Sequence, residues 1–194
     1  MPPSIGIFVL AELTGALRDR IREIHEQFDP KLGRLTPPHL TITGSSGAGM
    51  IDARTSVATL TDALTPIAAA TEPLTLALGA PHRFPGTEII SLPLDPHGPL
   101  RTLHERIAAS GLSFRPSRFA FSPHVTLSYY PTLTRARERE LLALRVEEPL
   151  VIERLQLYLT RDPQPARRLL ELRLGAPVAL SASSAIGPSD RGRG

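Results

Sequence analysis

The stretches Pro38-His39-Leu40-Thr41-Ile42 and Pro123-His124-Val125-Thr126-Leu127 repeat one pattern of residue types. Each begins with proline and then alternates polar with aliphatic residues, which predicts a β-strand. Because successive side chains of a strand point to opposite faces, the histidine and the threonine of each stretch share one face. They lie roughly 7 Å apart along the strand. Two such pairs facing each other would surround a small anion such as phosphate.

A single His-x-Thr segment is most often the half-exposed polar face of a strand. The repetition favours a functional reading, because two of the six histidines stand at the same place in two matching segments. We therefore take His39 and His124 as candidate catalytic residues and Thr41 and Thr126 as their partners.

The two segments resemble the motifs of the two-histidine (2H) phosphoesterases, which include bacterial RNA 2',3'-cyclic phosphodiesterases, also called 2'-5' RNA ligases. That family carries one His-x-Thr-aliphatic motif in each half of the chain. The resemblance extends to Phe84-Pro85, to Leu100-Arg101-Thr102-Leu103-His104 and to Phe121-Ser122-Pro123. It covers about residues 4 to 175.

The resemblance implies an α+β bilobal fold. Two small antiparallel sheets, related by a pseudo-twofold axis and covered by outer helices, would each contribute one motif to a central cleft. We expect residues 1–180 to form this single two-lobed domain. Residues 181–194, rich in serine and glycine, are expected to be a disordered C-terminal tail.

The chain departs from the family pattern just after each motif. Thr43-Gly44-Ser45-Ser46-Gly47 stands where many members have a bulky Phe-Leu-Gly ending, and Tyr129 stands where an arginine is frequent. Both positions adjoin the expected pocket, so they concern the identity of the substrate more than the reaction.

Opening a 2',3'-cyclic phosphate requires a base to deprotonate the attacking water and an acid to protonate the leaving ribose oxygen. Histidine titrates near pH 6.5, so two imidazoles can supply both without a metal or other cofactor. The threonines would donate hydrogen bonds to the non-bridging oxygens. The symmetric motifs leave open which histidine is the base.

The predicted function is thus a metal-independent phosphodiesterase that opens 2',3'-cyclic phosphates to a 2'-phosphate. Its partners would be RNA ends carrying a 2',3'-cyclic phosphate or small cyclic nucleotides. Two alternatives remain: 2'-5' RNA ligase activity, and a catalytically weak RNA- or nucleotide-binding member of the same fold.

Candidate substrate-binding residues flank the motifs. Phe84, Tyr129 and Tyr130 could stack on a nucleobase, and strand alternation places Tyr130 on the face of His124. Phe121 falls on the opposite face and is expected in the core. Arg118 could bind phosphate, whereas Arg135, Arg137 and Arg139 lie among glutamates and fit a solvated helix face better.

A metal hydrolase explains the motifs less well. Neither motif has an aspartate or glutamate at ligand spacing, so a zinc site would need remote partners such as His82 or His97. We expect these two, together with His25 and His104, to be surface or packing residues, although the region of His104 resembles the family.

Composition is consistent with this reading. The 194 residues are 41% hydrophobic, which allows one sizeable core or two small lobes, and arginine supplies almost all the positive charge because Lys31 is the only lysine. No apolar run approaches membrane length, the N-terminus lacks a secretory signal, and the absence of cysteine excludes disulfides. We expect a cytoplasmic monomer that does not associate with membranes.

The remaining sequence alternates predicted strands and helices. We expect helices over 14–28, 51–70, 99–109 and 134–144. We expect strands over 5–10, 74–78, 88–94, 119–129, 150–159 and 167–174, the last two joined by a turn at Arg161-Asp162-Pro163.

Overall fold

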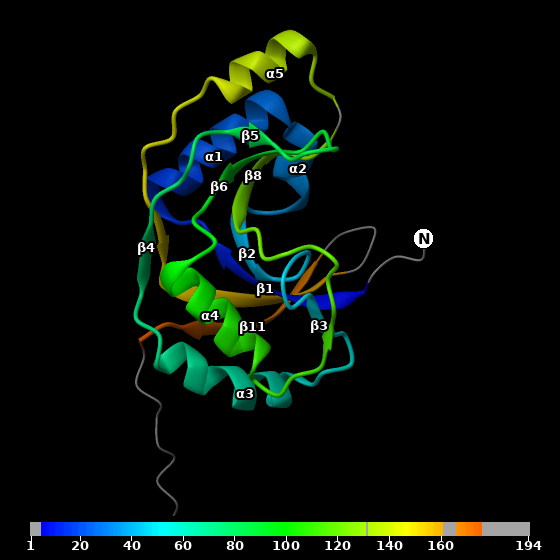
Figure 1. The fold of residues 1–194 in the computed structure, drawn as a ribbon, viewed down its shortest axis with the longest axis vertical. Helices are drawn as coiled ribbons and strands as arrows, with labels where there is room; N and C mark the ends of the chain where they lie inside the picture. Colours follow the sequence, from blue (N-terminus) through cyan, green and yellow to red (C-terminus); the bar gives the residue numbers. More distant parts are fainter. Residues whose placement is uncertain (1–4, 131, 161–165, 176–194) are drawn as a thin grey trace, which may run out of the picture.

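The two motif strands lie side by side in the middle of a large antiparallel sheet (Figure 1). The computed structural model describes residues 5–130, 132–160 and 166–175. Within them the main path of the sheet runs through seven strands, in spatial order β11 (Arg167–Arg173), β10 (Arg154–Thr160), β1 (Gly6–Glu12), β2 (His39–Thr43), β8 (His124–Ser128), β6 (Ile90–Pro93) and β5 (His82–Arg83).

Four short strands complete the β-structure of the described residues. β3 (Met50–Asp52) pairs with β1 and with β7 (Phe114–Arg115), which extends the sheet on one side. β4 (Leu74–Leu76) and β9 (Leu150–Ile152) form a separate two-stranded sheet.

Helices from each half of the chain support the motif strand of the other half. The helices of the described residues are α1 (Gly15–Phe28), α2 (Pro30–Leu35), α3 (Val57–Ala69), α4 (Gly98–Ala108) and α5 (Arg135–Leu142). α1 packs against β8, and α4 packs against β2. Their apolar faces share one core with Leu40 and Val125, the buried residues between the histidine and the threonine of each motif. None of these helices has the length and apolar character that crossing a membrane requires.

The α+β class predicted from the sequence is confirmed. The two sheets expected on either side of a twofold axis are joined in the structure, because Leu40 of β2 pairs with Val125 of β8. Strands β11, β10, β1 and β2 lie on one side of this junction, and strands β8, β6 and β5 lie on the other.

Most of the predicted helices are confirmed, but the helix expected over 51–70 begins too early. Residues 50–52 form β3, and a turn held by Asp52, whose carboxylate accepts hydrogen bonds from Arg54, separates it from α3. α3 begins only after Ser56, whose hydroxyl caps the helix by accepting a hydrogen bond from the Thr59 amide at 3.1 Å. The short helix α2 was not predicted.

Two predicted strands are wrong in extent. The strand expected over 119–129 spans only β8, because the backbone before it bonds to another loop, as in the bond from the Gly47 amide to the Phe119 carbonyl. The strand expected over 150–159 divides into β9, which pairs with β4, and β10, which forms the predicted hairpin with β11. The predicted turn at Arg161-Asp162-Pro163 and the tail 181–194 lie outside the described residues.

Candidate active site

The pairing of β2 with β8 brings the side chains of both motifs onto one face of the sheet. Leu40 and Val125 are directly opposite in the antiparallel ladder. Continuing this register by one residue in each direction sets His39 opposite Thr126 and sets Thr41 opposite His124. Directly opposite residues have Cβ atoms about 5 Å apart, and diagonal neighbours are about 7 to 8 Å apart. The motifs therefore form a square of alternating imidazoles and hydroxyls.

Each imidazole is held by an equivalent hydrogen bond to a backbone carbonyl two residues earlier in the chain. Nδ1 of His39 lies 2.8 Å from the carbonyl oxygen of Pro37, and Nδ1 of His124 lies 2.8 Å from that of Ser122. A carbonyl oxygen only accepts, so each Nδ1 carries a proton and donates it. The bond fixes the tautomer, and Nε2 of each ring has no hydrogen-bond partner among the described residues.

The surroundings of the two imidazoles favour their neutral form. Burial lowers the pKa of His39 below its ordinary value of 6.5, a hydrogen bond to Pro37 opposes this, and the nearby His124 lowers the pKa further. Burial likewise lowers the pKa of His124, with an added contribution from His82. His25 likewise lowers the pKa of His39, so a positive charge on either neighbouring imidazole disfavours the imidazolium form of His39.

The neighbours of the two imidazoles differ in charge. Glu12 is the cross-strand partner of His39, and its carboxylate acts to raise the pKa of that imidazole. Glu12 is held in turn by the hydroxyl of Tyr158, which donates to its carboxylate, and by Gln156, whose side-chain oxygen accepts from the Glu12 amide at 3.0 Å. No carboxylate of the described residues raises the pKa of His124.

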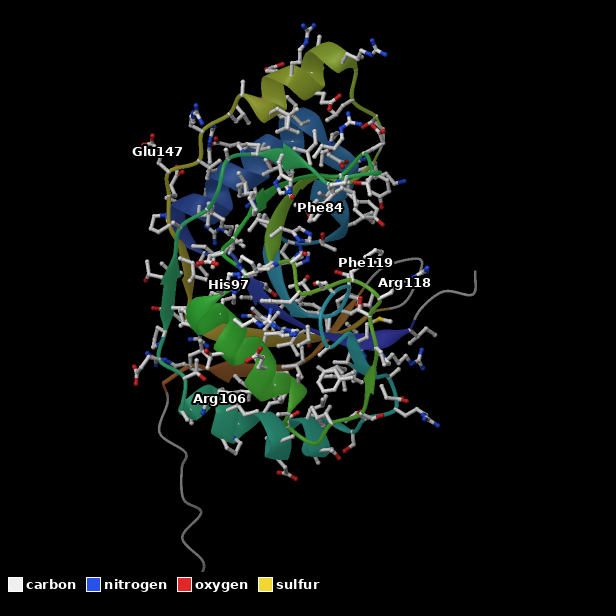
Figure 2. The ribbon with its side chains drawn as sticks, viewed as in Figure 1. Phe84, His97, Arg106, Arg118, Phe119 and Glu147 are labelled. Carbon is white, nitrogen blue, oxygen red and sulfur yellow. The ribbon has the colours of Figure 1, made fainter. Side chains whose placement is uncertain are left out.

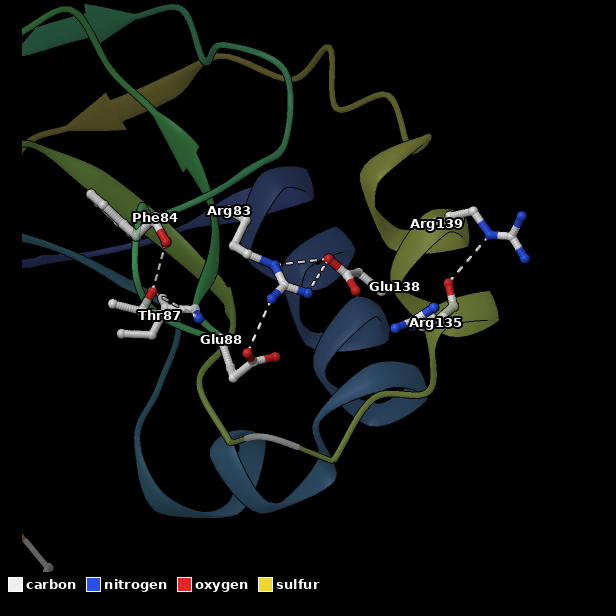
Figure 3. A network of polar contacts seen from close by, with 8 residues as sticks. Arg83, Phe84, Thr87, Glu88, Arg135, Glu138 and Arg139 are labelled. Atoms are coloured by element: carbon white, nitrogen blue, oxygen red, sulfur yellow. Dashed lines mark hydrogen bonds and ion pairs between the residues drawn. The ribbon is translucent and has the colours of Figure 1, made fainter.

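His124 instead has an aromatic neighbour. The ring of Phe84 lies edge-on to the imidazole of His124, with centroids 4.7 Å apart, and the ring of His82 lies 5.3 Å beyond Phe84. The segment that carries Phe84 is fixed in place, because Arg83 pairs with Glu138 of α5 and with Glu88 (Figure 3). Phe84 thus forms a wall of the site beside His124.

Each motif strand contains a β-bulge at the same position. On β2, Thr41 and Thr43 pair with the adjacent residues Leu10 and Val9 of β1, which leaves Ile42 as the extra residue. On β8, Thr126 and Ser128 pair with adjacent residues of β6, and the extra residue is Leu127. A bulge bends its strand and changes which face the following side chains occupy. Thr43 and Ser128 are accordingly fully buried rather than part of the polar face.

A buried histidine from the supporting helix bonds to a carbonyl at each bulge. His25 of α1 donates from Nε2 to the Thr126 carbonyl at 2.9 Å, and His104 of α4 donates from Nδ1 to the Ile42 carbonyl at 2.7 Å. The imidazole of His104 also accepts a hydrogen bond from the Ala48 amide at 3.3 Å and stacks on Phe121 with centroids 4.1 Å apart. These two histidines therefore connect the helices with the motif strands, and the expected core position of Phe121 is confirmed.

The predicted substrate-binding residues lie in three different parts of the structure. Phe84 touches His124, as described. Tyr129 and Tyr130 follow the end of β8, where the bulge and the end of the strand interrupt the alternation that placed Tyr130 beside His124. Their rings are 5.2 Å apart, and both amides donate to the buried carboxylate of Asp29. Arg118 lies in the exposed loop before β8 and lines a cavity next to the end of β2.

No group of three or more potential metal-ligating side chains lies close enough together to hold a metal ion in the part of the chain that the structure describes. His82 is half-buried next to Phe84, whereas His97 is exposed at the start of α4 (Figure 2).

Sequence reasoning missed the carboxylate beside His39 and the roles of the two helix histidines. Glu12 is a polar residue at the end of an otherwise apolar strand. Gln156 falls at a polar position of an alternating strand and is nevertheless buried, so residue type gave no signal for its role. His25 lies on the apolar face of its helix, one turn after Ile21. The misplaced polar residues Glu12 and His25 were the available signal.

Comparison with known proteins gives a consistent assignment. The family model of the 2'-5' RNA ligase superfamily matches residues 13–164. The search of curated protein sequences finds no match. Among solved structures, E. coli LigT complexed with 3'-AMP has a TM-score of 0.58 at 18% identity, covering 90% of this chain and 99% of that one. The protein TT0787 of Thermus thermophilus has a TM-score of 0.61 at 15% identity, covering 88% and 98%. At such identities these two likenesses show a shared fold.

Proposed function

The chain belongs to the 2'-5' RNA ligase superfamily, and from this we propose that it opens 2',3'-cyclic phosphates to 2'-phosphates by acid and base catalysis with His39 and His124. The observation that carries the proposal is the square of two imidazoles and two threonine hydroxyls on one face of the sheet. The E. coli relative that has been crystallised with 3'-AMP supports nucleotides as the class of substrate.

The chemistry needs one proton removed and one supplied. Nε2 of one histidine takes a proton from a water molecule as its oxygen attacks phosphorus. The bond between phosphorus and the 3'-oxygen breaks, and the other histidine donates a proton to that oxygen. Thr41 and Thr126 donate hydrogen bonds to the non-bridging oxygens, whose negative charge is concentrated in the pentacoordinate transition state.

The unequal surroundings of the imidazoles favour one assignment of roles. A carboxylate stabilises an imidazolium, so His39 beside Glu12 is the better acid. His124 lies beside the aromatic ring of Phe84, and no carboxylate of the described residues raises its pKa, so its surroundings favour the neutral imidazole that a base requires. We assign His124 as the base that activates water and His39 as the acid that protonates the ribose oxygen.

The direct test is turnover of adenosine 2',3'-cyclic phosphate and of a short RNA with a 2',3'-cyclic end, with separation of 2'- and 3'-phosphate products. His39→Ala and His124→Ala are each expected to lower turnover by about 10²–10⁴-fold, which is the usual contribution of one positioned proton-transfer group. His97→Ala is the matched control, because His97 is exposed at the start of α4.

Activity is also expected to survive exhaustive treatment with a chelator. Wild-type turnover in either motif variant would contradict the mechanism. Nucleotide binding without turnover by the unaltered protein would instead identify a binding member of the family.

The family model supports ligation as a second candidate. In that reaction the 5'-hydroxyl of another RNA takes the place of water, and the same base and acid act on the same phosphate. Adding RNA with a free 5'-hydroxyl to the assay and analysing for 2'-5' linked product tests this candidate.

A further inference from the structure

Tyr158 reaches from its own strand to the residue beside His39. It lies in β10 and pairs with Phe8 of β1, whereas its hydroxyl donates to the carboxylate of Glu12, four residues further along β1. To span this distance the side chain runs along β1 past Leu10, which lies between Phe8 and Glu12 on the same face of the sheet. Leu10 is only 8% exposed, as expected of a residue that lies under this ring.

The face that Tyr158 covers is the one that carries the motifs. The register of β1 with β2 sets Leu10 opposite Thr41 and sets Glu12 opposite His39. Directly opposite residues share a face, and their Cβ atoms are about 5 Å apart. The Tyr158 side chain therefore lies one strand away from the first motif, alongside both its threonine and its histidine.

Glu12 is held at two points by β10. The Tyr158 hydroxyl donates to its carboxylate, and the side-chain oxygen of Gln156 accepts from its amide at 3.0 Å. This amide lies beyond the last residue pair of β1 with β10, so a side chain takes the place of a ladder partner. Gln156 is itself fixed, because its Nε2 donates to Glu171 of β11 at 3.3 Å. Both the backbone and the side chain of Glu12 are thus anchored.

The Tyr158 hydroxyl is the donor of this contact. Burial and the hydrogen bond to Glu12 raise the pKa of Tyr158 to about 12, so the hydroxyl keeps its proton over the range in which histidines titrate. A hydroxyl is neutral, so it orients the carboxylate without cancelling its negative charge. A guanidinium in the same place would pair with the carboxylate and weaken its effect on His39.

The charged groups on the other side of Tyr158 are engaged with one another. Arg168 of β11, the cross-strand partner of Tyr158, forms an ion pair with Glu171 at 3.3 Å, and Arg154 pairs with the same carboxylate at 2.8 Å. Arg168 lowers the pKa of Tyr158 and Glu171 raises it, so these two groups oppose each other. The direction of the Tyr158 hydroxyl is therefore set by Glu12.

Three titratable side chains act on His39 from three elements. His124 of β8 and His25 of α1 lower the pKa of His39, and Glu12 of β1 raises it. Glu12 is the one carboxylate among these three, so the ease with which His39 takes up a proton depends on where this carboxylate is held.

We propose that Tyr158 is a positioning residue that holds the Glu12 carboxylate toward His39, so that His39 is more readily protonated and can donate to the leaving ribose oxygen. The inference rests on the proposed function and deepens it. It adds a tyrosine of the C-terminal hairpin to a site whose reacting groups come from the two motifs.

Tyr158→Phe tests the proposal because it removes the hydroxyl and keeps the ring over Leu10. An NMR titration of the His39 imidazole in the protein without substrate should give a lower pKa than in the wild type, since the released carboxylate can turn toward solvent. The loss of the signal in His39→Ala assigns it. At about pH 7.5, kcat/KM for adenosine 2',3'-cyclic phosphate should fall by about tenfold, mostly through kcat, which is the scale of one hydrogen bond to a charged group.

A second variant shows whether Tyr158 acts through Glu12. Glu12→Gln keeps an acceptor for the hydroxyl but removes the charge, so it should also lower the pKa of His39. Tyr158→Phe added to Glu12→Gln should then cause no further fall in kcat/KM. Glu153→Gln is the matched control, because it removes the same charge from an exposed position just before β10 and should leave the titration of His39 unchanged.

An unchanged pKa of His39 in Tyr158→Phe would overturn the inference while leaving the proposed function intact. Additive effects of Tyr158→Phe and Glu12→Gln on kcat/KM would also overturn it, because the hydroxyl would then act independently of the carboxylate. If the wild-type protein opens no cyclic phosphate, the proposed function fails, and the inference fails with it even where the titration shows that Glu12 acts on His39.

Discussion

His39 and His124 each donate a hydrogen bond to a backbone carbonyl, and burial lowers the pKa of both. They differ in the side chains that lie beside them. A carboxylate next to one imidazole and an aromatic ring next to the other give two chemically identical groups different tasks. The difference arises from long-range pairing, since Glu12 reaches His39 through the register of β1 with β2.

The assignment of acid and base predicts a selective rescue. A phosphodiester with p-nitrophenolate as the leaving group needs no proton on that group. His39→Ala is expected to recover most of its lost activity on this substrate, whereas His124→Ala should remain impaired because water still needs a base. The measurement is kcat/KM of each variant relative to wild type on both substrates. The opposite pattern would exchange the two roles.

The lowered pKa values predict the pH dependence of the reaction. The active form has one neutral and one protonated imidazole, and burial lowers the pKa of both His39 and His124 below 6.5. That form is therefore most populated on the acidic side of pH 6.5, and kcat/KM should follow a bell with its maximum there. The bound phosphate anion favours an imidazolium, so the maximum of kcat should lie at a higher pH than the maximum of kcat/KM. A maximum of kcat/KM above about pH 7.5 would contradict this account.

At the scale of elements, the paired bulges determine where each motif strand stops presenting polar side chains. Period-two alternation correctly assigns the faces of Leu40 and Val125, and apolar spacing correctly predicts α1. It does not predict the bulges, because an extra residue in a ladder has no signature of residue type in a single strand. For the same reason the alternation that placed Tyr130 beside His124 cannot be continued past Leu127.

The His104 side chain tests how far the catalytic face depends on its bulge. His104→Phe retains an aromatic ring to stack on Phe121 but leaves the Ile42 carbonyl and the Ala48 amide without this partner. The free energy of unfolding should fall by about 1–3 kcal/mol, and kcat should fall more than KM rises, because Thr41 precedes the disturbed bulge. Urea denaturation and steady-state kinetics measure the two effects.

His104→Gln offers a donor and an acceptor and should recover part of the lost kcat. A His104→Phe variant with wild-type kcat would show that the imidazole contributes to packing alone.

At the scale of the whole molecule, the contacts that complete the site join distant parts of the chain. Glu12 and Gln156 are 144 positions apart, and His25 and Thr126 are 101 apart. Local patterns predicted the motif strands and most helices, but they contain no information on which strand of one half lies beside which strand of the other. The resemblance to a family supplied the α+β fold, and the structure supplied the neighbours of each imidazole.

Three histidines with lowered pKa values predict that the fold weakens in mild acid. Burial lowers the pKa of His25, His39 and His124 below the value of about 6.5 that they regain on unfolding. The unfolded chain then binds more protons than the native state as pH falls from 6.5, so the free energy of unfolding decreases through this window. Urea denaturation between about pH 5 and 7.5 measures the slope. His25→Phe should reduce the slope, and a wild-type slope in this variant would contradict the contribution of His25.

Each half of the chain depends on the other half for the helix that covers its motif strand. α1 covers the strand that carries His124, and α4 covers the strand that carries His39. A fragment ending between the motifs would expose an apolar strand surface and would leave its own helix uncovered. Neither half is therefore expected to fold as a stable monomer when it is expressed without the other.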